Sequence, residues 1–352
     1  MAQTASNRLN KRKQTVARIL LKTTIPTTED DWSIARFSML RDLLGESHQV
    51  EARDRITDER GDDVDLAGGS DLPFDQIWLF AVDATNALTA ADIAGIEAFR
   101  RRGGGLLLTR DHFDLGSGLS KLSGIGAAHH FHNVNPETEP ERRTRDDPFT
   151  LQIDWPNYHS GANGDYQEIE AITPAHPLLR RADGGAIRYL PAHPHEGAVS
   201  APTELGGAAR VVARGTSSVT GRPFNLMVAI DRYRHDGADL GRAVAEATFH
   251  RFADYNWNTA AGCPTFVNEP PGNGLQREPR ALNDTRDYAR NIAEWLSRSY
   301  SLRIRRRLGP VKPAHRAEAT AIIGTRRNRQ HRGQNSGPRF ARLISSAAAV
   351  CA

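Results

Sequence analysis

Two unbroken apolar runs, one on each side of a helical segment, constrain the fold of this chain most. The runs are Gln76–Val82 (QIWLFAV) and Leu106–Thr109 (LLLT), and such runs are typical of strands buried on both faces of a sheet. Between them the sequence predicts a helix over Ala90–Arg101, with Thr89 and Asp92 as a variant of the capping box. A run of three glycines ends this helix. Strand, helix and strand in this order predict two parallel strands joined by a crossover.

The same alternation precedes this unit. Val16–Ile25 is apolar and β-rich, Asp31–Leu44 carries apolar residues at helical spacing, and His48–Ala52 is a short strand. Alternating strands and helices build a mostly parallel sheet with helices on both faces, so we expect an α/β protein. Because crossovers between parallel strands are right-handed, the carboxyl ends of these strands should lie at one edge of the sheet.

The chain beyond residue 130 is less regular. Residues 133–167 form a long polar stretch rich in proline, which predicts a loop insertion with a functional or flexible role. Further strand-like runs and a last amphipathic helix follow, at Ala186–Leu190, Ala208–Ala213, Phe224–Ile230, Arg242–Thr248 and Thr285–Ser297. From about residue 302 the apolar period is lost. We expect residues 1–300 to form one α/β domain and residues 301–352 to form a basic, disordered tail.

Charge is distributed unevenly along the chain. Of the 46 Lys and Arg and 42 Asp and Glu residues, residues 301–352 hold 12 bases and a single acid. The first 300 residues therefore carry 34 bases against 41 acids. A mildly acidic body lacks the basic surface of a nucleic-acid-binding protein. Arginine clusters in the tail can bind phosphate, but without interleaved aromatic residues we favour a solvated extension.

The expected setting follows from what the sequence lacks. No apolar stretch approaches the roughly 18–20 residues of a membrane helix, and no apolar segment follows the basic N-terminus to make a secretory signal. Cys263 and Cys351 are the only cysteines, which excludes a disulfide framework and favours a reduced, cytoplasmic location. The expected partner is a small molecule and not a membrane. The last helix could pack on the body or on a second copy of the chain, so a homo-oligomer stays open.

Polar side chains follow three of the predicted strands. Ligands of open α/β sheets bind beyond the carboxyl ends of the strands, so these positions form the expected site. The residues are Asp111 and His112 after LLLT, His193, His195 and Glu196 after IRYL, and His250 and Asp254 after AVAEATF. Three separate groups of histidine with carboxylate at one sheet edge are the strongest indication of function.

The spacing within these groups suggests how the side chains point. In extended chain His193 and His195 face the same way and Glu196 faces the other way. The neighbouring prolines lack N–H donors, so this segment suits the exit from a strand and not a central strand. His250 and Asp254 are four residues apart and share a face if this piece is helical, which makes Asp254 a candidate partner of His250.

Two kinds of chemistry fit these residue types. Histidines with a carboxylate can hold a divalent metal ion with open positions for a substrate, and the candidate ligands are His193, His195, His250 and Asp254. The same pocket could work by proton transfer, with His193 or His195 as general base, Glu196 as orienting partner, and Asp111 and His112 beside them. A third possibility is that the histidines only satisfy loop backbone groups.

Several common catalytic motifs are absent. The sequence has neither a GxxxxGK[ST] phosphate loop nor a GxSxG nucleophile elbow. Neither cysteine follows a predicted strand. Nucleotide binding by a phosphate loop and thiol catalysis are therefore not expected.

The segment FDQIWLFAVDATNALTAADIAGIEAFRRRGGGLLLTRDH resembles the class I glutamine amidotransferase-like superfamily and, within it, the ThuA-like branch. ITPAHPLL resembles the His-Pro turn of that branch, and the likeness covers roughly Val16–Ser297. The resemblance implies a flavodoxin-like sheet with its functional elbow near Asp111 or His112. It also implies that the segment from His193 to Glu196 matches the His-x-Glu segment of amidotransferases. The elbow cysteine of that family is missing here, so glutamine hydrolysis through a thioester is not expected.

The resemblance and the polar residues together predict an enzyme of the ThuA-like kind. It would hydrolyse or isomerise a small polar molecule, with a carbohydrate derivative as one candidate, by a His/carboxylate pocket with or without a metal ion. The alternative is a catalytically inactive protein of the same fold that binds a ligand or serves as a scaffold. The missing cysteine favours the alternative, and the dense histidines favour the enzyme.

Overall fold

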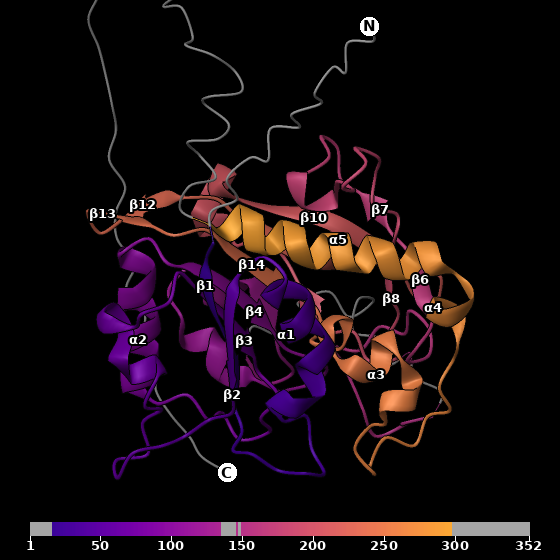
Figure 1. Cartoon of the computed structure of the whole chain (residues 1–352), viewed down its shortest axis with the longest axis horizontal. Helices are drawn as coiled ribbons and strands as arrows, with labels where there is room; N and C mark the ends of the chain where they lie inside the picture. Colours follow the sequence, from indigo (N-terminus) through magenta and orange to yellow (C-terminus); the bar gives the residue numbers. More distant parts are fainter. Residues whose placement is uncertain (1–15, 135–145, 147–148, 298–352) are drawn as a thin grey trace, which may run out of the picture. The chain divides into compact units, whose positions relative to one another are not determined.

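The computed structural model describes residues 16–134, 146 and 149–297 (Figure 1). The predicted tail over 301–352 lies outside the described residues, as does most of the segment from 135 to 148 in the predicted loop insertion. Every helix of the described part is too short or too polar to cross a lipid bilayer.

A central sheet organises the described part of the chain, with eight strands in the order β2-β1-β3-β4-β14-β11-β10-β7. The strands from β2 to β14 in this order pair in parallel, and β11, β10 and β7 add antiparallel pairs. Their bounds are β1 Arg18–Thr23, β2 Gln49–Arg53, β3 Gln76–Phe80, β4 Gly105–Thr109, β7 Glu170–Ala171, β10 Ala209–Thr216, β11 Pro223–Ile230 and β14 Ala243–Glu246. The order 2-1-3-4 with a fifth parallel strand is that of a flavodoxin-like sheet. The predicted mostly parallel α/β sheet is confirmed.

The unbroken apolar runs form the inner strands. All residues of β3 and β4 are buried, and Ile77 lies opposite Leu106. Successive residues of a strand face opposite sides. Trp78 and Leu107 accordingly belong to the core on one face of the sheet, and Ile77 and Leu106 belong to the core on the other. A strand covered on both faces has no solvent side, which explains the lack of polar alternation.

Helices cover both faces of the sheet. Helices α1 (Ser38–Gly45) and α5 (Pro279–Leu296) contribute to one core, and α2 (Ala90–Arg101) contributes to the other. Figure 1 shows α1 and α5 on one side of the sheet and α2 on the other. The predicted cap of α2 is present, because the Thr89 hydroxyl accepts from the Asp92 N–H at 3.2 Å and the Asp92 carboxylate accepts from the Thr89 N–H at 3.0 Å.

Smaller elements complete the described part. Three two-stranded sheets pair β5 (His129–His130) with β9 (Ala198–Val199), β6 (Tyr166–Glu168) with β8 (Tyr189–Pro191), and β12 (Tyr233–His235) with β13 (Ala238–Leu240). Two short helices, α3 (Asp254–Trp257) and α4 (Gly274–Arg277), precede α5.

Two predicted elements differ from the observed ones. The helix predicted over Asp31–Leu44 is a 3₁₀ turn at Ile34–Phe37 followed by α1, which begins at Ser38. The strand predicted over Ala186–Leu190 is β8, which pairs with β6 and lies outside the central sheet. Pro191 at the end of β8 has no N–H to offer a second neighbouring strand, which suits a two-stranded ribbon.

Candidate active site

Two neighbouring strands of the central sheet deliver the first residues of the site. Strand β4 ends at Thr109 and β14 ends at Glu246, and these two residues are partners in the parallel register. Asp111 and His250 follow the two strand ends closely in sequence. Both therefore come to the carboxyl edge of the sheet, where ligands of this fold class bind.

A third segment reaches the same point from outside the central sheet. The loop after β8 carries His193 and His195, and Ser160 holds its backbone. The Ser160 Oγ accepts from the His193 N–H at 2.9 Å, and the Ser160 N–H donates to the His193 carbonyl at 3.0 Å. The expectation that the strand before this loop belongs to the same sheet as β4 and β14 is wrong, because β8 pairs only with β6 among the described strands. The loop still brings its histidines to Asp111 and His250.

One carboxylate lies among four imidazoles, and we name Asp111, His112, His193, His195 and His250 the Asp111 cluster. The Asp111 Oδ1 lies 3.3 Å from Nε2 of His193. The Asp111 Oδ2 lies 2.9 Å from Nδ1 of His112 and 3.6 Å from Nε2 of His250. The ring of His195 has its centroid 5.1 Å from that of His112 and 5.2 Å from that of His193. The structure thus brings five of the seven predicted site residues together.

Two asparagines determine which nitrogens of His193 and His250 carry a proton. The Asn256 Nδ2 donates to the main-chain carbonyl of Ala192 at 3.2 Å and to Oδ1 of Asn163 at 2.9 Å. A main-chain carbonyl only accepts, so the oxygens of both amides face the histidines. These oxygens lie 2.8 Å from Nδ1 of His193 and 3.2 Å from Nδ1 of His250. Both Nδ1 atoms therefore donate, so the Nε2 atom of each ring carries a lone pair whenever that ring has a single proton.

Burial sets the charge states at the centre of the cluster. Burial lowers the pKa of His193 well below its usual range, and the neighbouring His250 adds to this effect against the opposing charge of Asp111. Burial alone would raise the pKa of Asp111, but attraction to His193 and His250 in their protonated forms and the hydrogen bond with His112 hold the pKa of that carboxyl well below its usual range. Asp111 is therefore ionised and His193 neutral at pH 7. The two rings stack with centroids 3.6 Å apart, so double protonation would place like charges in contact.

The Nε2 atom of His193 lacks a hydrogen bond. It is buried, and no described residue donates to it. The charged group beside this nitrogen is the Asp111 carboxylate, which also accepts hydrogen bonds and donates none. Two buried acceptors that face each other are unfavourable unless a cation lies between them. The Nε2 of His250 faces the other oxygen of Asp111 in the same way.

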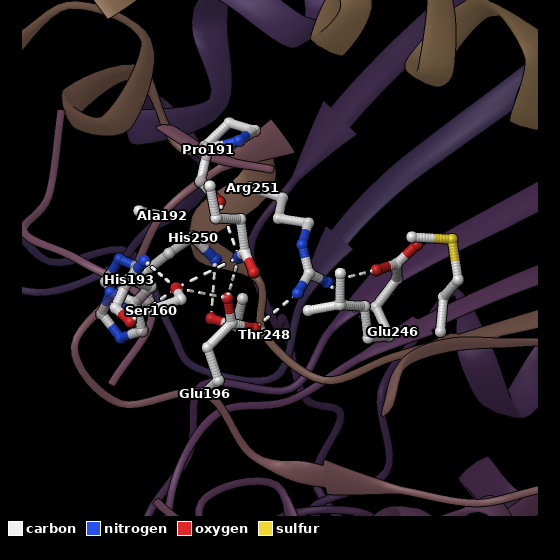
Figure 2. Close-up of polar contacts among 12 residues, drawn as sticks. Ser160, Pro191, Ala192, His193, Glu196, Glu246, Thr248, His250 and Arg251 are labelled. Atoms are coloured by element: carbon white, nitrogen blue, oxygen red, sulfur yellow. Dashed lines mark hydrogen bonds and ion pairs between the residues drawn. The ribbon is translucent and has the colours of Figure 1, made fainter. Parts of the chain in front are cut away.

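Glu196 points away from the cluster into a buried ion network, which we name the Arg251 network (Figure 2). One terminal nitrogen of Arg251 bonds to Glu196 and the other bonds to Glu246 at 2.6 Å, and all three side chains are fully buried. Gln167 and Ser160 donate to the second Glu196 oxygen at 2.6 and 3.0 Å. The structure thus places both Glu196 oxygens against Arg251, Gln167 and Ser160, and not against a histidine as its predicted role of orienting partner or ligand requires.

Asp254 also lies apart from the cluster. Its carboxylate accepts from the N–H and hydroxyl of Ser38 at 3.0 and 2.6 Å and from the N–H of Met39 at 2.8 Å. Asp254 therefore caps the start of α1, and Asn256 of the same short helix bonds to His250 instead. Among the described residues, Asp254 belongs to no group of potential metal ligands. The structure therefore does not show the predicted pairing with His250, and it places the carboxylate apart from the other predicted metal ligands.

Replacing Asp254 by alanine is expected to lower the free energy of unfolding by about 1–2 kcal/mol, because the first N–H groups of α1 lose their acceptor. Divalent-metal binding should stay unchanged, since the carboxylate does not reach the cluster. Urea unfolding and a zinc titration measure the two effects, and Asp254→Asn, which keeps one acceptor oxygen, should lose less stability. A variant that folds normally but no longer binds zinc would return Asp254 to the site.

Four residues with a structural role here escaped prediction: Asn163, Thr248, Arg251 and Asn256. Thr248 donates to Oδ1 of Asp111 at 2.9 Å, and its position just after β14 could have revealed it. Asn163 lies in a polar loop, where asparagine is common for reasons of turn geometry, so nothing in the sequence marks it. Nothing in the sequence around Arg251 indicates that its side chain is buried.

Two overlapping triads of potential metal ligands share Asp111. One consists of Asp111, His193 and His250, which are buried, and the other of Asp111, His112 and His195, whose histidines are half-buried. Within each triad the ligand atoms lie within 4.8 Å of one another. Two histidines and one carboxylate with open positions form a known type of divalent-metal site. His112 and His195 are the members of the cluster that keep some exposed surface.

No protein-family model matches this chain, and no curated protein matches it. Among solved structures, a ThuA-like protein from Parabacteroides merdae is 14% identical over 73% of this chain and 95% of its own, with a TM-score of 0.38. A ThuA-like protein from Bacteroides uniformis is 11% identical over 81% of this chain and 95% of its own, with a TM-score of 0.41. The glutaminase domain of CTPS from Trypanosoma brucei, solved with bound acivicin, is 12% identical over 79% of this chain and 94% of its own, with a TM-score of 0.36.

Proposed function

We propose that this chain is a metal-dependent enzyme of the hydrolase or isomerase type that acts on a small polar molecule. Asp111, His193 and His250 are the proposed metal ligands. The observation that carries the proposal is the buried Nε2 of His193, which presents a lone pair to the ionised Asp111 and receives no hydrogen bond from the described residues. A divalent cation at this point would remove the repulsion and satisfy both groups.

The donor set fits a divalent transition metal. Imidazole nitrogens with one carboxylate suit zinc or iron(II), whereas calcium and magnesium prefer sites made of oxygen. Two ligands of one ion, each about 2.1 Å from it, lie about 3.0–3.5 Å apart. The separations from Asp111 oxygens to Nε2 of His193 and His250 are 3.3 and 3.6 Å. Asn163 and Asn256 supply the outer hydrogen bonds that ligating histidines usually make.

The remaining histidines of the cluster suit proton transfer. A bound divalent ion supplies Lewis acidity and an activated water to a site of this kind. His112 and His195 are half-buried, so a substrate can reach them. Their imidazoles can take a proton from an attacking group or return one to a leaving group. The exposed parts of His112 and His195 are polar, so they favour a polar substrate. Carbohydrate derivatives are the first class to assay.

A ligand-binding protein without catalysis is the second candidate function. The burial of the proposed ligands favours it, because Asp111, His193 and His250 are only 2%, 2% and 4% exposed. A centre this enclosed could serve to hold the three segments together, as structural metal sites do.

A zinc titration of metal-free protein, prepared without a histidine tag, tests the metal site. The wild type should bind one zinc ion in competition with a chromophoric chelator, and the His193→Ala/His250→Ala variant should bind none. His235→Ala removes an exposed imidazole from β12 and is the matched control, with zinc binding retained. Equal binding by all three proteins would rule out the proposed ligands.

A second variant separates catalysis from metal binding. His195→Gln keeps the buried triad and removes an imidazole that a substrate can reach. On a panel of sugar lactones, aldoses and ketoses, an enzyme should show zinc-dependent turnover that falls by about 100-fold or more in this variant while zinc stays bound. Zinc binding by the wild type with no turnover, and with stabilisation by one of these compounds, would favour the ligand-binding protein.

A further inference from the structure

A separate hollow in the described residues has a volume of about 680 Å³, and none of its lining residues belongs to the Asp111 cluster. Its walls come from β5, β9, β10 and β11 and from the turn before β11. Sites for small molecules have volumes of about 300–1,000 Å³, so the hollow can hold one.

Two arginines line this pocket, and the described lining residues include no Asp or Glu. Arg214 lies on β10, and Arg222 precedes β11, the strand that pairs with β10. The Nε of Arg214 donates to Oδ1 of Asn225 at 3.3 Å, and Asn225 in turn donates to the Val199 carbonyl at 3.0 Å. Within the described part of the chain, Arg222 makes no side-chain hydrogen bond or ion pair, and no Asp or Glu lines the pocket. Both arginine side chains are exposed, and no acidic residue among the described lining residues balances their positive charge.

The rest of the lining combines polar donors with aromatic walls. The Ser200 hydroxyl and the Nε2 of His130 lie 2.6 Å apart in a hydrogen bond. The rings of Tyr158 and Phe224 stack with centroids 4.9 Å apart and an interplanar angle of 6°. An anionic group would find charged and neutral donors here, and the less polar body of the same molecule would find an aromatic wall.

We propose that this pocket binds a small molecule through an oxyanion group, either a phosphate or a carboxylate. Guanidinium groups present paired N–H donors in a planar fork that matches both kinds of oxyanion. An anion that reaches both Arg214 and Arg222 would gain two charge-assisted contacts. The proposal is independent of the metal site, since the two sets of residues do not overlap.

Calorimetric titrations of the full chain with inorganic phosphate and with malonate test this pocket. Saturable binding of one ion per chain is expected for at least one of the two, and the tighter of them identifies the group that the pocket prefers. Arg214→Gln and Arg222→Gln should each weaken that binding by about tenfold or more, because a hydrogen bond to a charged group is lost. Arg234→Gln removes an exposed arginine from β12 and is the matched control, with binding unchanged.

The same titration of Asp111→Asn separates this pocket from the Asp111 cluster. Unchanged anion binding in that variant supports the proposal. Binding that is lost in Asp111→Asn but kept in Arg214→Gln and Arg222→Gln would place the anion at the cluster and overturn it. The absence of saturable binding for both anions would also overturn it.

Discussion

Replacing Arg251 by methionine is expected to destabilise the protein by about 3–5 kcal/mol at neutral pH, because it leaves buried charge without a partner. Arg251 bonds to Glu196 and Glu246, and all three side chains are fully buried. Methionine retains an unbranched apolar side chain, so the substitution removes mainly the charge and its hydrogen bonds. The measurement is the free energy of unfolding in urea.

Two control variants define the cause of this loss. Adding Glu196→Gln and Glu246→Gln to Arg251→Met removes the stranded charges and should restore a large part of the stability. Arg290→Met breaks an exposed pair with Glu46, with side chains 44% and 60% exposed, and should cost less than about 1 kcal/mol. If Arg251→Met cost no more than Arg290→Met, the Arg251 network would not be the buried support that we describe.

The pH dependence of the Arg251 variant follows from the same charges. Burial raises the pKa of Glu246 to about 7 and also raises that of Glu196, even though Arg251 opposes both shifts. Without Arg251 both pKa values should rise further. The folded variant then binds protons that the unfolded chain does not hold, so its stability should increase as the pH falls from 8 to 5. If the loss in free energy of unfolding of Arg251→Met relative to the wild type did not change with pH, its cause would be lost packing and not unpaired charge.

Replacing Asp111 by asparagine should weaken zinc binding by more than about 100-fold, since residues that only orient metal ligands are already worth about 10–100-fold. The variant keeps the size of the side chain and loses its charge. Its effect on the metal-free protein should be small or stabilising, because the new amide can donate to a histidine Nε2 that now faces a carboxylate.

Unfolding measurements with and without zinc check both parts of this result. Excess zinc should stabilise the wild type, because it binds the folded state, and should stabilise Asp111→Asn much less. Equal stabilisation of both proteins would exclude Asp111 as a ligand. If metal-free Asp111→Asn unfolded with a free energy more than about 2 kcal/mol below that of the metal-free wild type, the carboxylate would have a structural role that we have not identified.

Local sequence was a good guide to the inner strands and to α2. The runs in β3 and β4 are apolar because both faces are covered, and Thr89 with Asp92 marks the start of α2 within one turn. Such features depend on neighbours in the sequence, so the sequence reveals them. The start of α1 is different, because its N–H groups bind Asp254 from a distant part of the chain.

The candidate site was predicted in part. The rule that polar residues after parallel strands converge placed Asp111 and His250 correctly, and spacing alone placed His193 and His195 on the same side, away from Glu196. The rule does not say which carboxylate partners which histidine. Glu196 and Asp254 are close to the histidines in sequence, but each meets other groups, Arg251 in one case and the start of α1 in the other.

The sequence by itself therefore determined the alternation of elements, the mostly parallel sheet and the short stretches from which the Asp111 cluster is drawn. The tertiary structure decided the protonation pattern of the cluster and the separation between the cluster and the Arg251 network. The physical reason is that hydrogen bonds between atoms of specific side chains require positions accurate to a fraction of an ångström. The contact between Asn163 and Asn256, which directs both Nε2 atoms at Asp111, joins residues 93 positions apart and exists only once the chain has packed.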